Sequence, residues 1–186
     1  MSTSTLSDLT YDDLAGFPQD DRLRRELIDG ELFVTPAPDL RHQDVVARLT
    51  AMLVVHADEH GGRVLPAPTD VVFSPDIVVE PDVVYIGAER VDELGDARFI
   101  DIVPDLLVEV SSSTTRRLDL IKKRNLYERE GVPEFWFVDL EAGQIDVHRL
   151  DAAGVYGMPA SLGEGDVLTC LAAPGFELSV SAALCR

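Results

Sequence analysis

Apolar residues recur along this chain with two periods, one typical of helices and one typical of strands. A helical period runs through residues 40–60, where the apolar positions share one side: Val45, Val46, Leu49, Met52 and Leu53. Asp39 can cap the start of this helix, and Gly61-Gly62 supplies a stop after His60. The pattern predicts one long amphipathic helix early in the chain.

Shorter apolar segments predict strands on both sides of this helix. Residues 25–29 and 31–35 flank Asp29-Gly30, a dipeptide suited to the positive φ angles of a tight turn, so they predict a β-hairpin. After the helix, strand patterns occur at residues 63–65, 70–73, 77–79 and 83–86. Residues 88–102 mix charges with few apolar positions and predict a short helix and a loop.

The following segment predicts a crossover between parallel strands. Residues 106–110 and 135–138 are apolar on both faces, as in buried strands. Between them, a helix is predicted to begin at Thr114 or Thr115 and to end near Gly131. Strand, helix and strand in this order indicate a parallel pair with a right-handed crossover. Residues 144–150 alternate and predict an antiparallel partner for the second strand.

Together these elements predict an α/β fold with a mixed central β-sheet flanked by helices. The hairpin lies N-terminal to the sheet, and the glycine-containing tail, residues 151–186, predicts a C-terminal extension of loops and short edge strands. Residues 1–20 predict an N-terminal arm with one turn capped by Thr10. At 186 residues, without an internal repeat, the whole chain, 1–186, is expected to form a single domain.

The charge balance restricts the function classes. The chain has 34 acidic and 16 basic residues and a formal net charge of −18, which repels nucleic acid at long range. A nucleic-acid substrate therefore requires a local basic patch, a bound metal or a second subunit. No apolar run is long enough for a membrane helix, the start lacks a secretion signal, and two cysteines suggest no disulfide framework. We expect a cytoplasmic protein without membrane contacts.

Two acidic residues stand beside or within apolar strands, where an ionised carboxylate costs several kcal/mol unless it is paired or binds a metal. Glu109 lies inside the strand 106–110, and Asp82 lies between two apolar runs. Carboxylate oxygens favour Mg²⁺ or Mn²⁺ over zinc. Asp105 is four residues from Glu109 on one strand, about 13 Å at ~3.3 Å per residue, which is too far to share one ion.

Several segments, in a shared order and spacing over roughly residues 24–150, resemble the Uma-two family of endonucleases in the PD-(D/E)xK superfamily. The matching segments are Glu26-Leu27-Ile28-Asp29-Gly30-Glu31-Leu32, Arg41-His42-Gln43, Glu80-Pro81-Asp82-Val83, Pro104-Asp105-Leu106-Leu107-Val108-Glu109-Val110, Thr115-Arg116-Arg117, Asp119, Lys123-Arg124, Leu126-Tyr127, and Gly131-Val132-Pro133-Glu134-Phe135-Trp136-Phe137-Val138-Asp139. The resemblance implies a restriction endonuclease-like core.

The resemblance also implies a metal-dependent catalytic site. Asp82, Glu109 and the carbonyl of Val110 match the metal ligands of the superfamily. Ser111 occupies the usual lysine position, and the family places its lysine on the next helix, at Lys123. Glu31 and His42 match recurrent family positions and imply supporting catalytic roles. Their alternatives are a hairpin surface acid and a solvent-facing residue of the first helical turn.

Arg116, Arg117, Lys122, Lys123 and Arg124 form a dense basic cluster just after the proposed site. Such a cluster can meet nucleic-acid phosphates, or it can be a solvated helix face. We expect Arg116, Arg117, Lys122 and Arg124 to bind nucleic acid. Lys123 and Tyr127 are four residues apart on the predicted helix, as are Asp119 and Lys123, so the three share one stripe.

These inferences predict a Mg²⁺- or Mn²⁺-dependent endonuclease that hydrolyses phosphodiester bonds of DNA. Two alternatives remain: a catalytically degenerate nuclease-fold domain that binds a partner, and a metal-dependent hydrolase of small phosphorylated molecules. The degenerate domain is favoured by Ser111, and both fit the net charge. Members of the superfamily often work as dimers, so the resemblance allows a homodimer.

Overall fold

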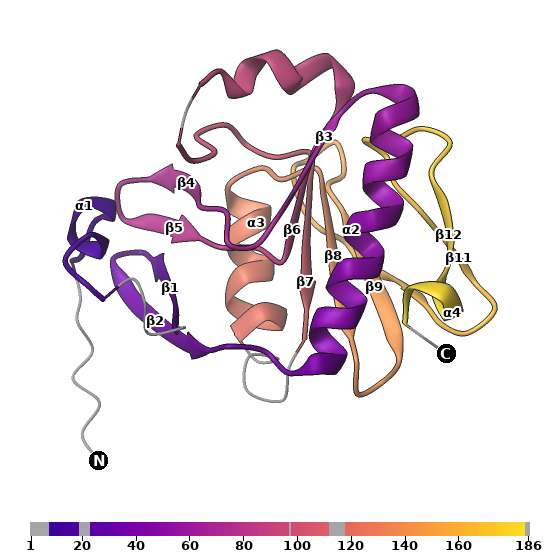
Figure 1. The fold of residues 1–186 in the computed structure, drawn as a ribbon, viewed down its shortest axis with the longest axis horizontal. Coiled ribbons are helices and arrows are strands. Elements are labelled where there is room, and N and C mark those ends of the chain that lie inside the picture. The colour runs from indigo at the N-terminus through magenta and orange to yellow at the C-terminus, as the bar shows by residue number, and fades with distance from the viewer. Residues whose placement is uncertain (1–7, 19–22, 97, 112–117, 185–186) are drawn as a thin grey trace.

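The computed structural model describes residues 8–18, 23–96, 98–111 and 118–184, with the side chains of residues 118 and 119 excepted. Its centre is a six-stranded sheet in the order β10-β9-β8-β7-β6-β3 (Figure 1). The strands are β3 (Arg63–Pro66), β6 (Val83–Ile86), β7 (Leu106–Val110), β8 (Glu134–Asp139), β9 (Gln144–Arg149) and β10 (Ala160–Leu162). Strands β7 and β8 are parallel and the other neighbours antiparallel, so the predicted mixed sheet is confirmed.

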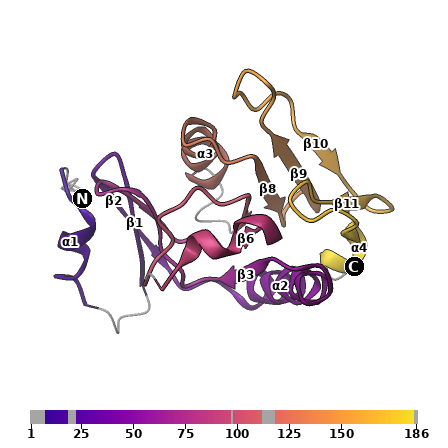
Figure 2. The same ribbon diagram turned by 90° about the horizontal axis from the view of Figure 1, so that it is seen from above.

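Helices cover both faces of this sheet (Figure 2). On one face lies α2 (Leu40–His60), whose apolar side packs against β6, β7 and β8 with residues such as Leu49, Val108 and Trp136. On the other face lies α3 (Arg124–Arg129), preceded by the π-helix η2 (Leu118–Lys123); its Leu126 and Tyr127 pack against Leu107 and Phe137. The predicted start of this second helix, at Thr114 or Thr115, falls outside the described residues.

The N-terminal hairpin belongs to a second sheet, which the sequence did not separate from the first. Its four strands run in the order β2-β1-β5-β4 and are all antiparallel: β1 (Leu23–Ile28), β2 (Glu31–Pro36), β4 (Val71–Ser74) and β5 (Ile77–Val79). The hairpin turn is as predicted, with positive φ at Asp29 (53°) and Gly30 (73°). This sheet brings β1 next to the beginning of β6, because β5 and β6 are separated by only three residues.

The remaining elements are short. Residues Tyr11–Leu14 form α1, and Ala88–Leu94 form the 3₁₀ helix η1. The tail adds the pair β11 (Val167–Thr169) and β12 (Glu177–Ser179), followed by α4 (Val180–Ala183). Leu168, Phe176 and Val180 join the core under α2, so the predicted β extension is an integral part of the packing. None of the described helices is both long and apolar enough to cross a membrane.

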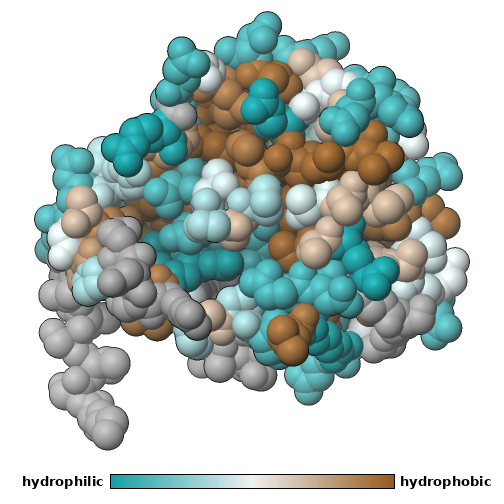
Figure 3. All heavy atoms as spheres, in the orientation of Figure 1, coloured by the Kyte–Doolittle hydropathy of each residue, from teal (hydrophilic) through white to brown (hydrophobic). Residues whose placement is uncertain are grey.

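Apolar side chains also reach the surface on the face that carries α2. Figure 3 shows them gathered over the upper part of this face, while polar side chains dominate its centre and left. On α2 itself Met52, Val54 and Val55 are 40%, 37% and 55% exposed. The outer face of this helix is therefore only partly polar.

A buried histidine on β9 makes stability sensitive to acid. His148 lies between Phe135 and Tyr156, with ring centroids 5.5 and 5.7 Å away, and neither ring nitrogen has a hydrogen-bond partner among the described residues. Burial, with a smaller contribution from the positive charge of Arg124, lowers the pKa of His148; Asp146 and Glu128 oppose this shift. The fold therefore favours the neutral ring.

We expect the free energy of unfolding to fall by up to about 1 kcal/mol between pH 7 and 5.5 on account of His148. In the unfolded chain His148 takes up a proton near pH ~6.5, whereas burial keeps the ring neutral in the folded state. The contribution of His148 to stability is therefore complete above this pH and is lost as the pH falls below it. Urea unfolding at several pH values should show a shallower decline for His148→Phe. Equal pH slopes for the two proteins would contradict the prediction.

Candidate metal and nuclease site

The site begins at the junction of β6 and β7. Asp82 directly precedes β6, and the last pair on the Asp82 side of the ladder joins Val83 to Val108. Just past that pair, the backbone N–H of Val110 donates a hydrogen bond of 2.8 Å to Asp82 Oδ2. Asp82 is thus bonded to the residue that follows Glu109, and each acid is only 1% exposed. Antiparallel pairing brings together two acids that lie 27 positions apart in the sequence.

Asp82 is held by partners from two further elements. Arg24, on β1, donates to Asp82 Oδ1 at 2.8 Å. His42, in the first turn of α2, places Nε2 3.1 Å from Asp82 Oδ2, and Asp39 caps that turn by accepting from His42 N–H at 2.9 Å. Burial alone would raise the pKa of Asp82, but the His42 hydrogen bond and the charge of Arg24 outweigh it and lower the pKa to about 2. Asp82 is therefore ionised, and Nε2 of His42 carries the proton that it donates.

Glu109 is held by residues of η2 and α3, which cover the face of the sheet opposite α2. Lys123, at the end of η2, donates to Glu109 Oε1 at 2.8 Å, and the hydroxyl of Tyr127 donates to the same oxygen at 2.6 Å. Lys123 and Tyr127 are one helical turn apart, which explains how both reach one carboxylate. The ammonium of Lys123 also lies 2.7 Å from Glu26 Oε1 on β1, and it is 1% exposed. A fully buried lysine thus bridges two carboxylates from two different sheets.

Among the described residues, Arg24 and Glu80 form the outer edge of the network. Glu80 donates its backbone N–H to Glu26 Oε1 at 2.8 Å, and its Oε2 lies 3.9 Å from Arg24 Nε. Burial raises the pKa of Glu80 to about 7, although Arg24 opposes this shift. The side chains of Arg24 and Glu80 are 19% and 18% exposed, whereas those of Asp82, Glu109, Glu26 and Lys123 are 1–2% exposed.

Four of the residues predicted as catalytic lie in this network: Asp82, Glu109, Lys123 and His42. Val110 also contacts it, through its N–H rather than through the carbonyl that was expected to bind metal. The solvent-facing alternative for His42 is wrong, because this residue is 4% exposed. Its position three and four residues before Val45 and Val46, on the apolar stripe of α2, is the sequence signal that predicts this burial.

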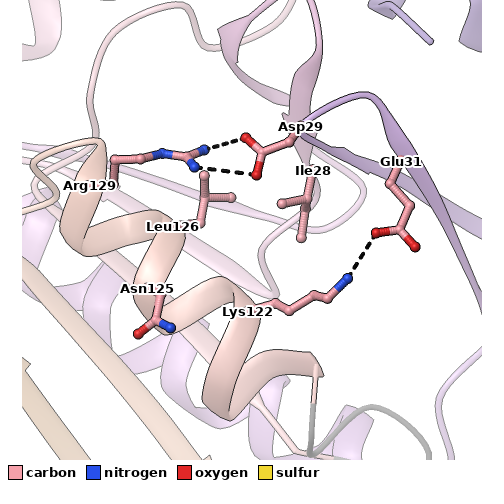
Figure 4. A pocket seen from close by; sticks show the side chains of 7 residues that line it. All are labelled: Ile28, Asp29, Glu31, Lys122, Asn125, Leu126 and Arg129. Atoms are coloured by element: carbon pink, nitrogen blue, oxygen red, sulfur yellow. Dashed lines mark hydrogen bonds and ion pairs between the residues drawn. The ribbon is translucent and has the colours of Figure 1, made fainter. Parts of the chain in front are cut away.

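The structure does not bring Glu31 to this network. Its carboxylate pairs with Lys122 at 2.9 Å, and the two side chains are 37% and 46% exposed. As Figure 4 shows, this pair and the Asp29–Arg129 pair border a pocket of about 400 Å³ between the hairpin turn and α3. Glu31 begins β2 opposite Ile28, at the turn end of the hairpin, and its position matches the alternative of a surface acid.

The predicted basic cluster is only partly described. Arg116 and Arg117 lie outside the described residues. Lys122 pairs with Glu31 and lies 4.2 Å from the ring centre of Phe33, and Arg124 pairs with Glu128 at 3.0 Å and donates to the carbonyl of Tyr156 at 2.7 Å. Lys122 and Arg124 are therefore already engaged within the protein, and their binding of nucleic acid stays a prediction.

Sequence reasoning left out Glu26, Arg24 and Glu80 as site residues. Glu26 precedes the apolar pair Leu27-Ile28 and is 2% exposed. The signal is weaker than at Glu109, because Glu26 has apolar neighbours on one side only and follows Arg24 and Arg25. Glu80 directly follows the apolar run Ile77-Val78-Val79, as Asp82 nearly does, and so carries a related signal. Arg24 carries none, because its role depends on how β1 packs beside the segment before β6.

The donor chemistry fits a hard divalent cation, with one restriction. Asp82 and Glu109 supply the carboxylate oxygens that Mg²⁺ and Mn²⁺ prefer. Asp82, Glu109, Glu26 and Glu80 exceed the two cations Arg24 and Lys123 by two negative charges only when Glu80, whose pKa is raised to about 7, is ionised together with the other three. Among the residues that the structure describes, however, no three acidic, histidine or cysteine side chains are grouped to hold a metal. Asp82 Oδ1 accepts from Arg24 and Oδ2 accepts from His42 and Val110, so a cation would compete with these partners for the carboxylate.

A second pocket adjoins the network at Glu80. It has a volume of about 560 Å³ and is lined by residues that include Tyr11, Arg25, Asp70, Glu80 and Arg98. Glu80 forms part of its wall and at the same time contacts Arg24 and Glu26 behind it. This pocket and the Arg24–Glu80 pair therefore offer solvent one approach to the buried acids.

Comparison with known proteins identifies a family and a fold. A family model, Uma2, described as "Putative restriction endonuclease", matches residues 9–181. A solved structure, described as "a putative nuclease belonging to DUF820" from Anabaena variabilis ATCC 29413, superposes with a TM-score of 0.80. The two chains are 16% identical, and the alignment covers 95% of this chain and 98% of that one, so the likeness shows a shared fold. The comparison with curated proteins yields no match.

Proposed function

Because the chain belongs to the Uma2 family of restriction endonuclease-like proteins, we propose that it is a divalent-metal-dependent endonuclease that hydrolyses phosphodiester bonds of DNA. One observation carries this proposal. Asp82, Glu109 and Lys123, which come from three separate segments, meet in one buried network of ion pairs and hydrogen bonds. Burying so many charges is costly for folding, and such clusters occur preferentially at functional sites.

Asp82 and Glu109 would hold Mg²⁺ or Mn²⁺. The bound ion would supply Lewis-acid chemistry, stabilising charge on the phosphate and lowering the pKa of a bound water. His42 keeps Asp82 ionised and oriented through the hydrogen bond from Nε2. Lys123 serves as the catalytic lysine, because Ser111 stands where the superfamily usually has one. Tyr127 donates to Glu109 and Glu26 pairs with Lys123, so both side chains are held in position. An ammonium at this position can orient the attacking water and stabilise negative charge at the phosphate.

One observation favours a second candidate, a nuclease-fold domain that binds a partner without catalysis. Both oxygens of Asp82 are engaged by Arg24, His42 and Val110, an arrangement that stabilises the carboxylate without a metal. The two candidates differ in metal binding. An enzyme should bind Mn²⁺ through Asp82, and a degenerate domain need not.

The test is a plasmid-nicking assay with Mg²⁺, Mn²⁺ or EDTA, combined with Mn²⁺ titration of wild type and Asp82→Asn. We expect nicking with either ion, none with EDTA, and loss of both Mn²⁺ binding and nicking in Asp82→Asn. Nucleotides and other small phosphorylated compounds assayed in parallel separate a polymer substrate from a small one. Nicking that persists unchanged in Asp82→Asn would point to a contaminant and remove the support for this site.

A further inference from the structure

Arg24 contacts Asp82, the carboxylate to which the proposed function assigns the cation. Its guanidinium donates to Asp82 Oδ1 at 2.8 Å, on a carboxylate that is 1% exposed. Burial alone would lower the pKa of Arg24, but the negative charges of Asp82, Glu109 and Glu26 raise it well above its usual range. The guanidinium thus lies in the electric field of Asp82 and Glu109, the proposed metal ligands, and of Glu26, which pairs with Lys123.

The two cations of the network differ in how easily they can leave it. Lys123 is 1% exposed and bridges Glu109 and Glu26, so moving it would strand two buried charges. Arg24 is 19% exposed and stands at the edge of the network. Its Nε lies 3.9 Å from Glu80 Oε2, and Glu80 lines the pocket of about 560 Å³. Arg24 therefore has a second carboxylate to pair with on the solvent side.

We propose that Arg24 competes with the divalent cation for Asp82, and that it moves its ion pair to Glu80 when the cation enters from the adjoining pocket. Arg24 is then a positioning residue that sets the metal affinity of the site. This inference rests on the proposed function, because it takes Asp82 to be the carboxylate that receives the ion.

The test compares Mn²⁺ affinity in wild type, Arg24→Gln and Arg25→Gln by calorimetry. Arg25 is a matched control: it neighbours Arg24 on β1, lines the pocket that Glu80 also lines, and its variant loses the same charge. Its own partners differ, because it donates to the carbonyl of Pro18 and lies 5.5 Å from the ring centre of Phe17. Removing the competitor should tighten Mn²⁺ binding at least about tenfold in Arg24→Gln. Arg25→Gln should stay within about twofold of wild type, because it removes only the long-range charge.

The outcomes separate this inference from the proposed function. If wild type binds Mn²⁺ through Asp82 and Arg24→Gln binds no more tightly, Arg24 does not compete and only this inference is overturned. If neither wild type nor Arg24→Gln binds Mn²⁺, Arg24 is not what excludes the ion, and the proposed metal site is contradicted as well. Tightening of similar size in both arginine variants would mean a general charge effect and would also overturn the inference.

A measurement on the wild type keeps the test decisive if Arg24→Gln does not fold. Addition of diamagnetic Mg²⁺ should shift the side-chain Nε–Hε NMR signal of Arg24 and leave the Arg149 signal in place. Arg149 is a suitable reference because its ion pair with Glu134 lies outside the site. An Arg24 signal that stays fixed while backbone signals near Asp82 move would overturn the inference.

Discussion

Replacing Glu109 by glutamine is expected to slow plasmid nicking at least about a hundredfold, because the site loses one of its two proposed metal ligands and the charge that holds Lys123. The side chain keeps its size and an acceptor oxygen, so Tyr127 can still donate to it. The measurement is the initial rate of nicking at saturating Mn²⁺. Circular dichroism and thermal unfolding confirm that the compared proteins are folded.

Glu134→Gln is the matched control for this change. Glu134 is also a glutamate in the central sheet, 0% exposed, but it accepts from Trp136 Nε1 at 2.7 Å and pairs with Arg149, outside the proposed site. Its variant should lose stability and keep the wild-type rate in the folded fraction. If Glu109→Gln nicks as fast as the folded Glu134→Gln protein, Glu109 takes no part in the reaction.

Replacing Lys123 by alanine should lower the free energy of unfolding by about 3–5 kcal/mol, because Glu109 and Glu26 would lose a shared buried cation. Urea unfolding at neutral pH measures this loss. The neighbouring Lys122→Ala is the control: Lys122 pairs with Glu31 on the surface, where such pairs contribute about 0–1 kcal/mol.

A triple variant separates the ion-pair effect from simple loss of packing. Lys123→Met combined with Glu109→Gln and Glu26→Gln removes both partners as well as the cation and keeps the volume. It should recover most of the stability that Lys123→Ala loses, since no unpaired charge remains buried. The same protein should be inactive. Lys123→Met alone also keeps the volume but leaves the two carboxylates without their cation, so it should stay unstable. If Lys123→Met were as stable as the triple variant, packing rather than charge pairing would explain the loss.

Stability and proposed catalysis depend on the same residues here. Lys123 and Glu109 connect η2 to the sheet, Glu26 connects the sheet of the hairpin to both, and Asp82 connects β1 and α2 to the β6–β7 junction. Activity losses in these variants therefore need to be read beside their unfolding curves. Arg24 is the exception, because its position at the edge of the network predicts a gain in metal affinity on substitution, which misfolding cannot produce.

The sequence by itself determined the features that depend on neighbouring residues. Asp29-Gly30 dictates a tight turn because those residues tolerate positive φ, and Asp39 and Gly61 delimit α2 because one caps it and the other stops it. The apolar strands at 106–110 and 134–139 form a parallel pair because a helix separates them. Glu109 and Asp82 could be predicted as site residues because an acid beside apolar strand residues needs a partner.

Only the tertiary structure decided which partner each charged residue meets. Glu26 and Glu31 lie five residues apart on one hairpin, yet one pairs with buried Lys123 and the other with surface Lys122, because the two positions fall at different depths against η2. Arg24 reaches Asp82 across 58 positions of sequence because the second sheet packs beside β6. Contacts of this kind depend on how separate elements pack together, and no local pattern of residues encodes that.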